Sequence, residues 1–329
     1  MPPVSVVVLA YENGDAIGEC LKSLGAQDYP NLEIVVTLDK TSRDKTAEVV
    51  NDFLMSHPSS RLEECSGVGR SKARNIGWKD CDSQIIMFAD GDDVFEPWYV
   101  SKAVDSLEKD SREGGVCLGG TALVQGNSRL ERYHRAFGGT DVRVAQGPDE
   151  NPDWAWVYWR RCLETVGGFD EGLAQAEDKD LCTRVKGAGY KIGYVSGVHW
   201  FHRKPESFSS LLKKEYKGGR RRIVFEAKHR DYRSAVIGVV PLLYVIVCLA
   251  SYFYLGPTGT VLLLAIGGIA YSTNAVLRRR FTSTSRGDAL AFIPVVLATK
   301  LAQSIGAVHG IILLALSRGG LAHPDFGRI

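Results

Sequence analysis

The sequence QIIMFADGDD, residues 84–93, is a short apolar run that ends in three carboxylates. A run of this length, rich in Ile and Phe, is typical of a strand buried on both faces of a sheet. Carboxylates this close resist ionising together unless a cation joins them, and oxygen ligands suit Mg²⁺ or Mn²⁺. Gly91 lets the backbone turn, so that Asp90 and Asp92 can face one point. An acidic surface turn is the alternative, because Asp-Gly is a common turn pair.

Composition narrows the classes of protein to consider. The 329 residues carry a net charge of +2, which argues against a general nucleic-acid binder. The 7 cysteines form no C-x-x-C pair, and their odd number argues against a disulfide framework, so we expect a reducing compartment for the soluble part. Basic residues concentrate between Lys213 and Arg233 and again at Arg278–Arg280.

Apolar runs and helical periodicities alternate along the first part of the chain. We predict strands over residues 4–9, 31–38 and 84–89, and helices over residues 16–24, 46–55 and 71–79. This alternation predicts an α/β domain with a mostly parallel sheet, whose ligands bind at the carboxyl ends of the strands. Tyr11, Asp39 and Asp90 all fall at such ends. No G-x-x-x-x-G-K-[ST] loop occurs, and no G-x-G-x-x-G segment follows the first strand, which argues against P-loop and dinucleotide proteins.

Three further segments stand out in the second half. Trp154–Arg161 is an unusual aromatic and basic cluster, which could also be an ordinary packed element of the core. Gly167–Glu171 is typical of a turn before a helix. Glu177 and Asp178 fall near the start of that helix, where the helix dipole favours negative charge. On spacing alone, ordinary capping explains these two acids.

The C-terminal third predicts a membrane anchor. Ala235–Leu255 is uncharged and long enough to span a bilayer, and Thr258–Leu277 is a second uncharged stretch. Ala289–Leu316 is a weaker candidate, since Lys300 interrupts it, and is either a tilted span or an interfacial segment followed by a re-entrant piece. Two or three spans are therefore expected, with a buried soluble hairpin as the alternative for the first two stretches.

A basic segment precedes these stretches. Ser207–Lys228 mixes apolar and basic residues, as in an amphipathic helix on an anionic membrane surface, broken at Gly218-Gly219. The alternative is that the basic residues of this segment only set the membrane topology and bind no ligand. The positive-inside rule puts the soluble domain in the cytoplasm. We therefore expect a globular domain over residues 1–205, a juxtamembrane segment over 206–233 and a transmembrane region over 234–329.

In this order, the segments resemble the motifs of family-2 glycosyltransferases with the GT-A fold, a Rossmann-like mixed and mostly parallel sheet. The resemblance covers roughly residues 4–205 and rests on Val4–Tyr11, Glu33–Thr46, the A-R-N-x-G segment Ala73–Gly77, the D-x-D at Asp90–Asp92, the G-G-F-D-E at Gly167–Glu171, and Glu177-Asp178.

The resemblance implies a role for each matching residue. The nucleotide-sugar would be bound by Tyr11, Asn13, Asp39, Arg74, Asp90, Gly91 and Asp92. Mg²⁺ or Mn²⁺ would be held by Asp90 and Asp92, with His199 or His202 as a further metal or phosphate contact. Asp178 would be the general base. The family commonly has Asn-Glu after the Tyr, whereas this chain has Glu12-Asn13, and the loop after Asp39 is about one residue longer than usual.

The predicted reaction is inverting, metal-dependent sugar transfer from a UDP- or GDP-linked donor. The basic segment suggests a membrane acceptor, a polyprenyl phosphate (dolichyl or undecaprenyl) or a lipid-linked glycan, held by Arg160, Lys213, Arg220 and Arg221. Such an integral membrane enzyme would serve protein glycosylation or the cell envelope. The rival readings are a processive polysaccharide synthase, a sugar nucleotidyltransferase and a non-catalytic scaffold. No Q-x-x-R-W motif of the synthases occurs.

Overall fold

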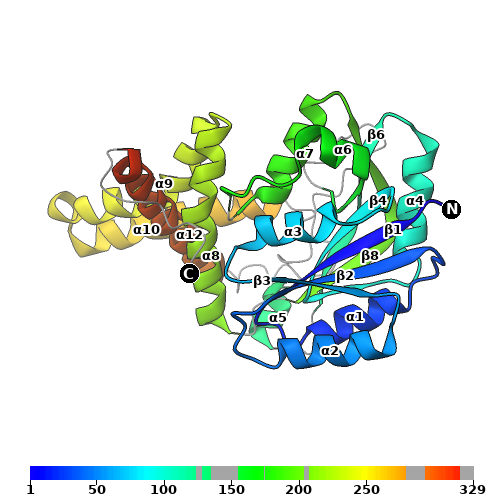
Figure 1. The fold of residues 1–329 in the computed structure, drawn as a ribbon. Helices are drawn as coiled ribbons and strands as arrows, with labels where there is room; N and C mark the ends of the chain where they lie inside the picture. Colours follow the sequence, from blue (N-terminus) through cyan, green and yellow to red (C-terminus); the bar gives the residue numbers. More distant parts are fainter. Residues whose placement is uncertain (124–127, 135–154, 174, 204–206, 279–292, 319–329) are drawn as a thin grey trace. The chain divides into compact units, whose positions relative to one another are not determined.

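The first strand of the chain lies near the centre of a mixed sheet (Figure 1). The structure, a computed structural model, describes residues 1–123, 128–134, 155–173, 175–203, 207–278 and 293–318. Contacts among them form two units. The first comprises residues 1–123 and 155–203 and contains the sheet, and the second comprises residues 128–134, 207–278 and 293–318 and is helical.

The sheet has the strand order β3-β2-β1-β4-β7-β6-β8-β5. Its strands are β1 Val4–Ala10, β2 Leu32–Asp39, β3 Arg61–Cys65, β4 Ile85–Asp90, β5 Asp93–Phe95, β6 Glu113–Leu123, β7 Val157–Trp159 and β8 Lys191–Arg203. Strands β1 to β4 run parallel, so their carboxyl ends meet at one edge. Strand β7 is antiparallel to β4 and β6, and β5 is antiparallel to β8.

Helices cover both faces of this sheet. The helices of the first unit are α1 Ile17–Gly25, α2 Thr46–Ser56, α3 Arg70–Lys79, α4 Tyr99–Lys109, α6 Arg160–Val166 and α7 Glu177–Gly187. Side chains alternate across a strand, so Val4, Val6 and Val8 of β1 pack with α1, α2 and α4, whereas Val7 packs with α3, α6 and α7 on the other face. The predicted mixed α/β fold is confirmed, and the predicted strands and helices occur within about one residue of their expected bounds.

The second unit consists of helices. They are α5 Arg129–Tyr133, α8 Phe208–Lys228, α9 Tyr232–Ala250, α10 Tyr252–Arg278, which is interrupted at Gly256, and α12 Ile293–Arg318. Among the described residues, only Pro294–Leu316 is long and apolar enough to cross a membrane by length and composition. The apolar parts of α9 and α10, Ala235–Ala250 and Tyr252–Leu264, are shorter. Ala289–Leu316, the weakest of the three predicted stretches, thus contains the longest candidate span among the described residues.

The predicted break at Gly218-Gly219 is wrong, because α8 runs through both glycines. Gly219 lies so close to α12 that a Cβ there would be 2.0 Å from the Gln303 carbonyl oxygen. The glycine permits a close helix contact, and a single sequence does not show that neighbour. Three of the segments singled out in the sequence lie partly outside the described residues. They are the basic cluster at Arg279 and Arg280, the aromatic cluster at Trp154 and the third apolar stretch at residues 289–292.

Candidate active site

The turn after β4 is shaped by glycine and by its own carboxylates. The Asp90 backbone N–H donates to Asp93 Oδ2 over 3.2 Å, which closes the turn. A Cβ at Gly91 would lie 1.9 Å from Asn13 Nδ2 and 2.7 Å from the Leu9 carbonyl oxygen, so only glycine fits. Asn13 therefore lies against this turn, and the loops after β1 and β4 share one edge of the sheet.

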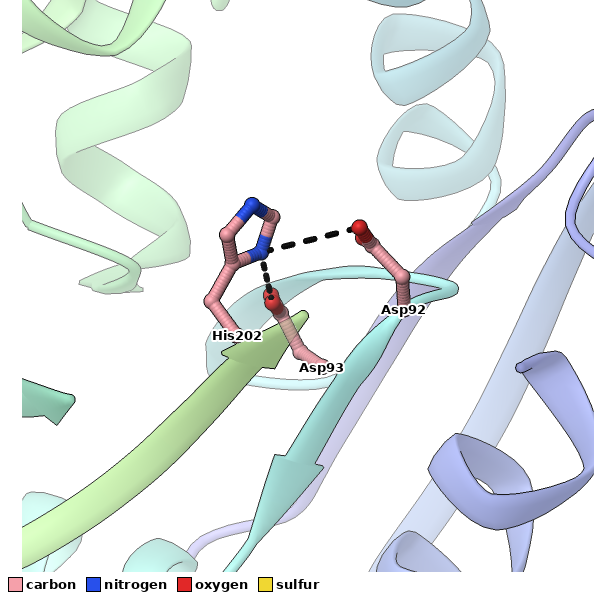
Figure 2. Close-up of side chains that lie close together, drawn as sticks. All are labelled: Asp92, Asp93 and His202. Carbon is pink, nitrogen blue, oxygen red and sulfur yellow. Dashed lines mark hydrogen bonds and ion pairs between the residues drawn. The ribbon is translucent and has the colours of Figure 1, made fainter. Parts of the chain in front are cut away.

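A cluster of Asp92, Asp93 and His202 can hold a cation (Figure 2). Each offers one ligand atom, and these atoms lie within 4.8 Å of one another. Nδ1 of His202 is 2.8 Å from Asp93 Oδ1 and 3.7 Å from Asp92 Oδ2. Burial raises the pKa of Asp93 to about 7, the His202 hydrogen bond opposes this, and the charges of Asp90 and Asp92 add to it. A divalent cation would relieve this repulsion, so the donor set fits one.

Two of the four predicted metal ligands lie elsewhere. Asp90 is bonded to Arg74 instead, and His199 lies beside Glu96, whose carboxylate accepts the His199 backbone N–H over 2.8 Å. Asp93 was not predicted, although it directly follows the D-x-D. The only hint in the sequence was that a third carboxylate stands there.

Arg74 links two carboxylates beneath the site. Its side chain is fully buried, and its Nη1 and Nη2 donate over 2.7 Å to Glu177 Oε1 and Asp90 Oδ1. Burial alone would raise the pKa of Asp90, but the Arg74 guanidinium outweighs it and holds that pKa at about 2. The guanidinium also lies over the rings of Trp156 and Phe169, at 5.1 and 5.2 Å. Arg74 thus joins the turn after β4 to α7, and its full burial does not fit the predicted nucleotide contact.

The neighbouring Asn75 holds the G-G-F-D-E loop. Its amide donates to the Phe169 carbonyl over 2.9 Å, and its oxygen accepts the Phe169 N–H over 2.9 Å. Gly168 faces this amide with φ +72°, where a Cβ would meet Asn75 Oδ1 at 2.6 Å. The two motifs, about 90 residues apart, are therefore one structural unit that sets the position of α7.

Asp178 lies in the first turn of α7, next to Glu177. Burial, together with the Glu177 charge, raises the pKa of Asp178 to about 6. Ala176 before the helix has φ 59°, a left-handed conformation that costs a residue with a Cβ about 1–2 kcal/mol. The half-buried carboxylate is therefore held at the helix start and is mostly ionised at neutral pH. Arg70, another residue that sequence reasoning missed, approaches Glu177 at 3.4 Å from α3.

The remaining predicted nucleotide residues lie along the same edge. Tyr11 is half exposed beyond β1. Asp39 ends β2, and its carboxylate accepts the backbone N–H groups of Thr41 and Gly67. Burial raises the pKa of Asp39, but these hydrogen bonds outweigh burial, so the pKa lies below its ordinary value. The buried Oδ1 of Asn13 has no partner among the described residues.

Arg160 is not part of this site. Its backbone N–H donates to the Gln84 carbonyl, before the start of β4, whereas Asp90 ends β4. At a rise of about 3.3 Å per residue, these points are roughly 20 Å apart. Because β7 runs antiparallel to β4, it carries Arg160 away from the carboxyl edge.

The predicted acceptor cations of the second unit lie on α8. Lys213 is exposed, Arg221 is half-buried and Arg220 is 8% exposed. Arg220 lies at the contact with α12, where a Cβ at Gly310 would be 2.3 Å from the Arg220 carbonyl oxygen. Its Nε has no partner within the described part of the chain.

Comparison with known proteins agrees with this geometry. Residues 5–162 match the family model described as glycosyl transferase family 2. The probable glycosyltransferase YdaM of Bacillus subtilis is 27% identical over 225 residues, which are 63% of this chain and 52% of YdaM. Glycosyltransferase AglE of Haloferax volcanii is 26% identical over 229 residues, 68% of this chain and 74% of AglE. The chain thus spans about half the length of YdaM.

A solved structure supports the fold. Mannosyltransferase PcManGT from Pyrobaculum calidifontis, in complex with GDP-Man and Mn²⁺, superimposes with a TM-score of 0.61 and 20% identity over 94% of this chain and 87% of PcManGT. The likeness establishes the GT-A fold predicted from the sequence.

Proposed function

We propose that this chain, a family-2 glycosyltransferase, transfers a sugar with inversion from a UDP- or GDP-linked donor to a polyprenyl phosphate at a membrane surface. Nucleotide-sugar transfer follows from the family. The observation that carries the acceptor is the packing of the basic helix α8 on the apolar helix α12. An integral membrane protein with its sheet domain in the cytoplasm would meet both a soluble donor and a lipid.

The donor would lie along the carboxyl edge of β1, β2 and β4. Tyr11 and Asp39 would contact the base and ribose, and Asp92, Asp93 and His202 would hold Mg²⁺ or Mn²⁺. When bound, the cation stabilises the negative charge of the leaving diphosphate. The PcManGT complex contains GDP-Man and Mn²⁺, which supports a similar donor and metal here.

Asp178 would act on the acceptor. With its pKa at about 6, it is ionised above that pH and can accept a proton from a hydroxyl. A phosphate acceptor is already anionic, so for it Asp178 would mainly position the attacking oxygen. Attack on the face opposite the leaving diphosphate inverts the anomeric centre.

The second unit supplies the argument for a lipid. Gly306 and Gly310 of α12 and Gly219 of α8 bring the two helix backbones into contact. This contact holds α8, which carries Lys213 and Arg221, against the candidate span. Cations next to an apolar helix suit a phosphate headgroup whose hydrocarbon chain stays in the bilayer.

The test is sugar transfer by the full-length protein purified in detergent. UDP- and GDP-sugars are supplied with Mn²⁺ or Mg²⁺, with and without a polyprenyl phosphate. We expect nucleotide release that needs both metal and lipid, with a single sugar added. Release that needs a glycan in place of the lipid phosphate, or products of many sugars, would refute the acceptor and favour the lipid-linked glycan or synthase reading.

Charge variants separate the acceptor from the donor. Replacing Lys213 and Arg221 by Gln should raise the KM for the lipid about tenfold and leave the donor KM unchanged. Arg112→Gln is the matched control, because Arg112 forms an exposed pair with Asp110. An equal loss for donor and lipid would contradict a lipid role for α8.

A further inference from the structure

Arg70 and Arg74 lie one turn apart on α3, and both approach the same carboxylate. Residues four apart share one face of a helix. Arg74 Nη1 donates to Glu177 Oε1 over 2.7 Å, whereas Arg70 Nη1 is 3.4 Å from the same oxygen. The side chain of Arg74 is fully buried, but that of Arg70 is 46% exposed. One face of α3 therefore carries an arginine enclosed by protein and, one turn earlier, an arginine open to solvent.

The guanidinium of Arg70 is largely free to bind a ligand. Its long contact with Glu177 is its only hydrogen bond or ion pair within the described part of the chain. That carboxylate is already paired with Arg74 at the shorter distance. An arginine side chain offers several N–H donors in a planar fork, so most of those of Arg70 remain available. The fork matches the oxygens of a phosphate group.

The charge of Arg70 acts on both sides of the site. Burial raises the pKa of Asp90, and the charges of Arg74 and then Arg70 lower it to about 2. Burial also raises the pKa of Asp178, to about 6, and the charge of Arg70 is among the influences that oppose this rise. The guanidinium therefore lies near the turn after β4 and near the start of α7, where Asp178 is proposed to act on the acceptor.

A phosphate acceptor would meet several negative charges at this edge of the sheet. Asp90 and Glu177 have lowered pKa values, and Asp178 is mostly ionised at neutral pH. A phosphate monoester adds roughly 1.5–2 negative charges at pH 7. The divalent cation of the proposed donor site would serve the leaving diphosphate, and Arg74 is enclosed by protein. Arg70 is an exposed cation beside these carboxylates and can offset the charge of the attacking phosphate.

We propose that Arg70 binds the phosphate group of the acceptor and makes the site prefer a phosphate to a hydroxyl. This inference rests on the proposed function and names the residue that holds the attacking group. A lone pair of a phosphate oxygen forms the new bond to the anomeric carbon, and the electron pair of the broken bond leaves with the nucleoside diphosphate. An anionic phosphate oxygen has no proton to lose, so a cation serves it better than a base does. The role proposed for α8 is different, since it concerns the capture of the lipid at the membrane surface.

Direct binding tests this assignment without turnover. Geranyl phosphate is titrated calorimetrically into the full-length protein in detergent, with UDP or GDP and Mg²⁺ present, and geraniol is the uncharged comparison. Arg70→Gln should bind geranyl phosphate about 10–100-fold more weakly than the unaltered protein does, and geraniol equally well. Arg70→Lys should lie between them, because an ammonium group keeps the charge but not the fork. An unchanged affinity of Arg70→Gln for geranyl phosphate would overturn the proposal.

Lys72→Gln is the matched control. Lys72 is an exposed cation in the same first turn of α3, and residues two apart do not share a helix face. Its affinity for geranyl phosphate should equal that of the unaltered protein. An equal loss in the Lys72 and Arg70 variants would show a general effect of charge and contradict the assignment.

Sugar transfer separates this inference from the proposed function. If the unaltered protein glycosylates a polyprenyl phosphate and Arg70→Gln keeps its kcat/KM for that lipid, the role of Arg70 alone is refuted. If the unaltered protein neither binds nor glycosylates a phosphate lipid, the proposed acceptor is wrong and the role of Arg70 with it. A loss of UDP or GDP affinity in Arg70→Gln as large as the loss for geranyl phosphate would assign Arg70 to the donor's diphosphate and overturn the proposal.

Discussion

Replacing Arg74 by Gln should destabilise the sheet domain strongly at neutral pH. The variant removes the cation that bridges two carboxylates: Asp90, whose side chain is 25% exposed, and Glu177, whose side chain is 4% exposed and which keeps only the longer 3.4 Å contact with Arg70. The pKa of Asp90 lies at about 2 against an ordinary 3.8. At about 1.4 kcal/mol per pKa unit, this difference corresponds to about 2.5 kcal/mol of stability, of which Arg74 supplies the largest part and Arg70 and His202 the rest. Glu177, whose pKa is also lowered, adds to it, so we expect a loss of about 3–5 kcal/mol.

The pH dependence has a definite sign. In the unaltered protein both carboxylates have lowered pKa values, so their contribution is present above the ordinary pKa near 4 and is lost as the pH falls through the lowered values. Without Arg74, burial raises the same pKa values, so the variant binds protons above pH 4. The difference in unfolding free energy between the two proteins should therefore be largest near pH 7 and shrink toward pH 4.

Urea unfolding of the full-length protein, followed by tryptophan fluorescence at several pH values, measures this difference. Arg112→Gln, which removes an exposed arginine, serves as the control and should show no measurable change. Arg74→Lys should lie between the two, because an ammonium group cannot bridge both carboxylates as the guanidinium does. A loss below about 1 kcal/mol at pH 7, or a difference independent of pH, would refute the reasoning.

Three further changes test other parts of the site. Asp178→Asn should keep nucleotide affinity and lose most turnover, and unchanged turnover would exclude Asp178 as the general base. With a hydroxyl acceptor, the unaltered enzyme should lose rate below about pH 6, where Asp178 is protonated. Gly77→Ala places a Cβ 2.4 Å from Val7 Cγ1 and should cost about 1–3 kcal/mol in urea unfolding, whereas Gly187→Ala, with open space around it, should stabilise by about 0.5–1 kcal/mol. Ala176→Val, at φ 59°, should lower the unfolding free energy by about 1–3 kcal/mol, and a Val variant as stable as the original would show that the segment relaxes freely.

The sequence predicted what is encoded locally. The apolar run before Asp90 gives β4, and the 3.6-residue spacing of Ile17, Cys20, Leu21 and Leu24 gives α1 with those residues buried. The carboxyl edge of a parallel sheet then follows from alternation alone. Strands β6 and β8 were not predicted, because glycines and aromatic residues obscure their period-2 pattern.

Contacts between distant residues were beyond the sequence. Asp93 and His202 are 109 positions apart, and their pairing depends on the register of β5 against β8. Gly219 looked like a helix break, because its neighbour Gln303 is visible only in three dimensions. Arg160 was grouped with the acceptor by charge, but the direction of β7 places it at the other end of β4.

The buried side chain of Arg74 connects two motifs that are far apart in the sequence, the D-x-D turn and the start of α7. Arg74 donates to the carboxylates of Asp90 and Glu177. Asp90 lies in the turn that also carries Asp92, and Glu177 directly precedes Asp178. Each carboxylate is therefore close in sequence to a residue that is proposed to act on the donor or the acceptor. Because Arg74 bonds both at 2.7 Å and is fully buried, a change in one carboxylate reaches the other through a single rigid group. The rate of an in-line displacement depends on how closely the acceptor's oxygen is held to the anomeric carbon, on the side opposite the leaving diphosphate. Arg74, which bonds both the turn after β4 and the start of α7, would therefore influence this position from a buried place in the fold.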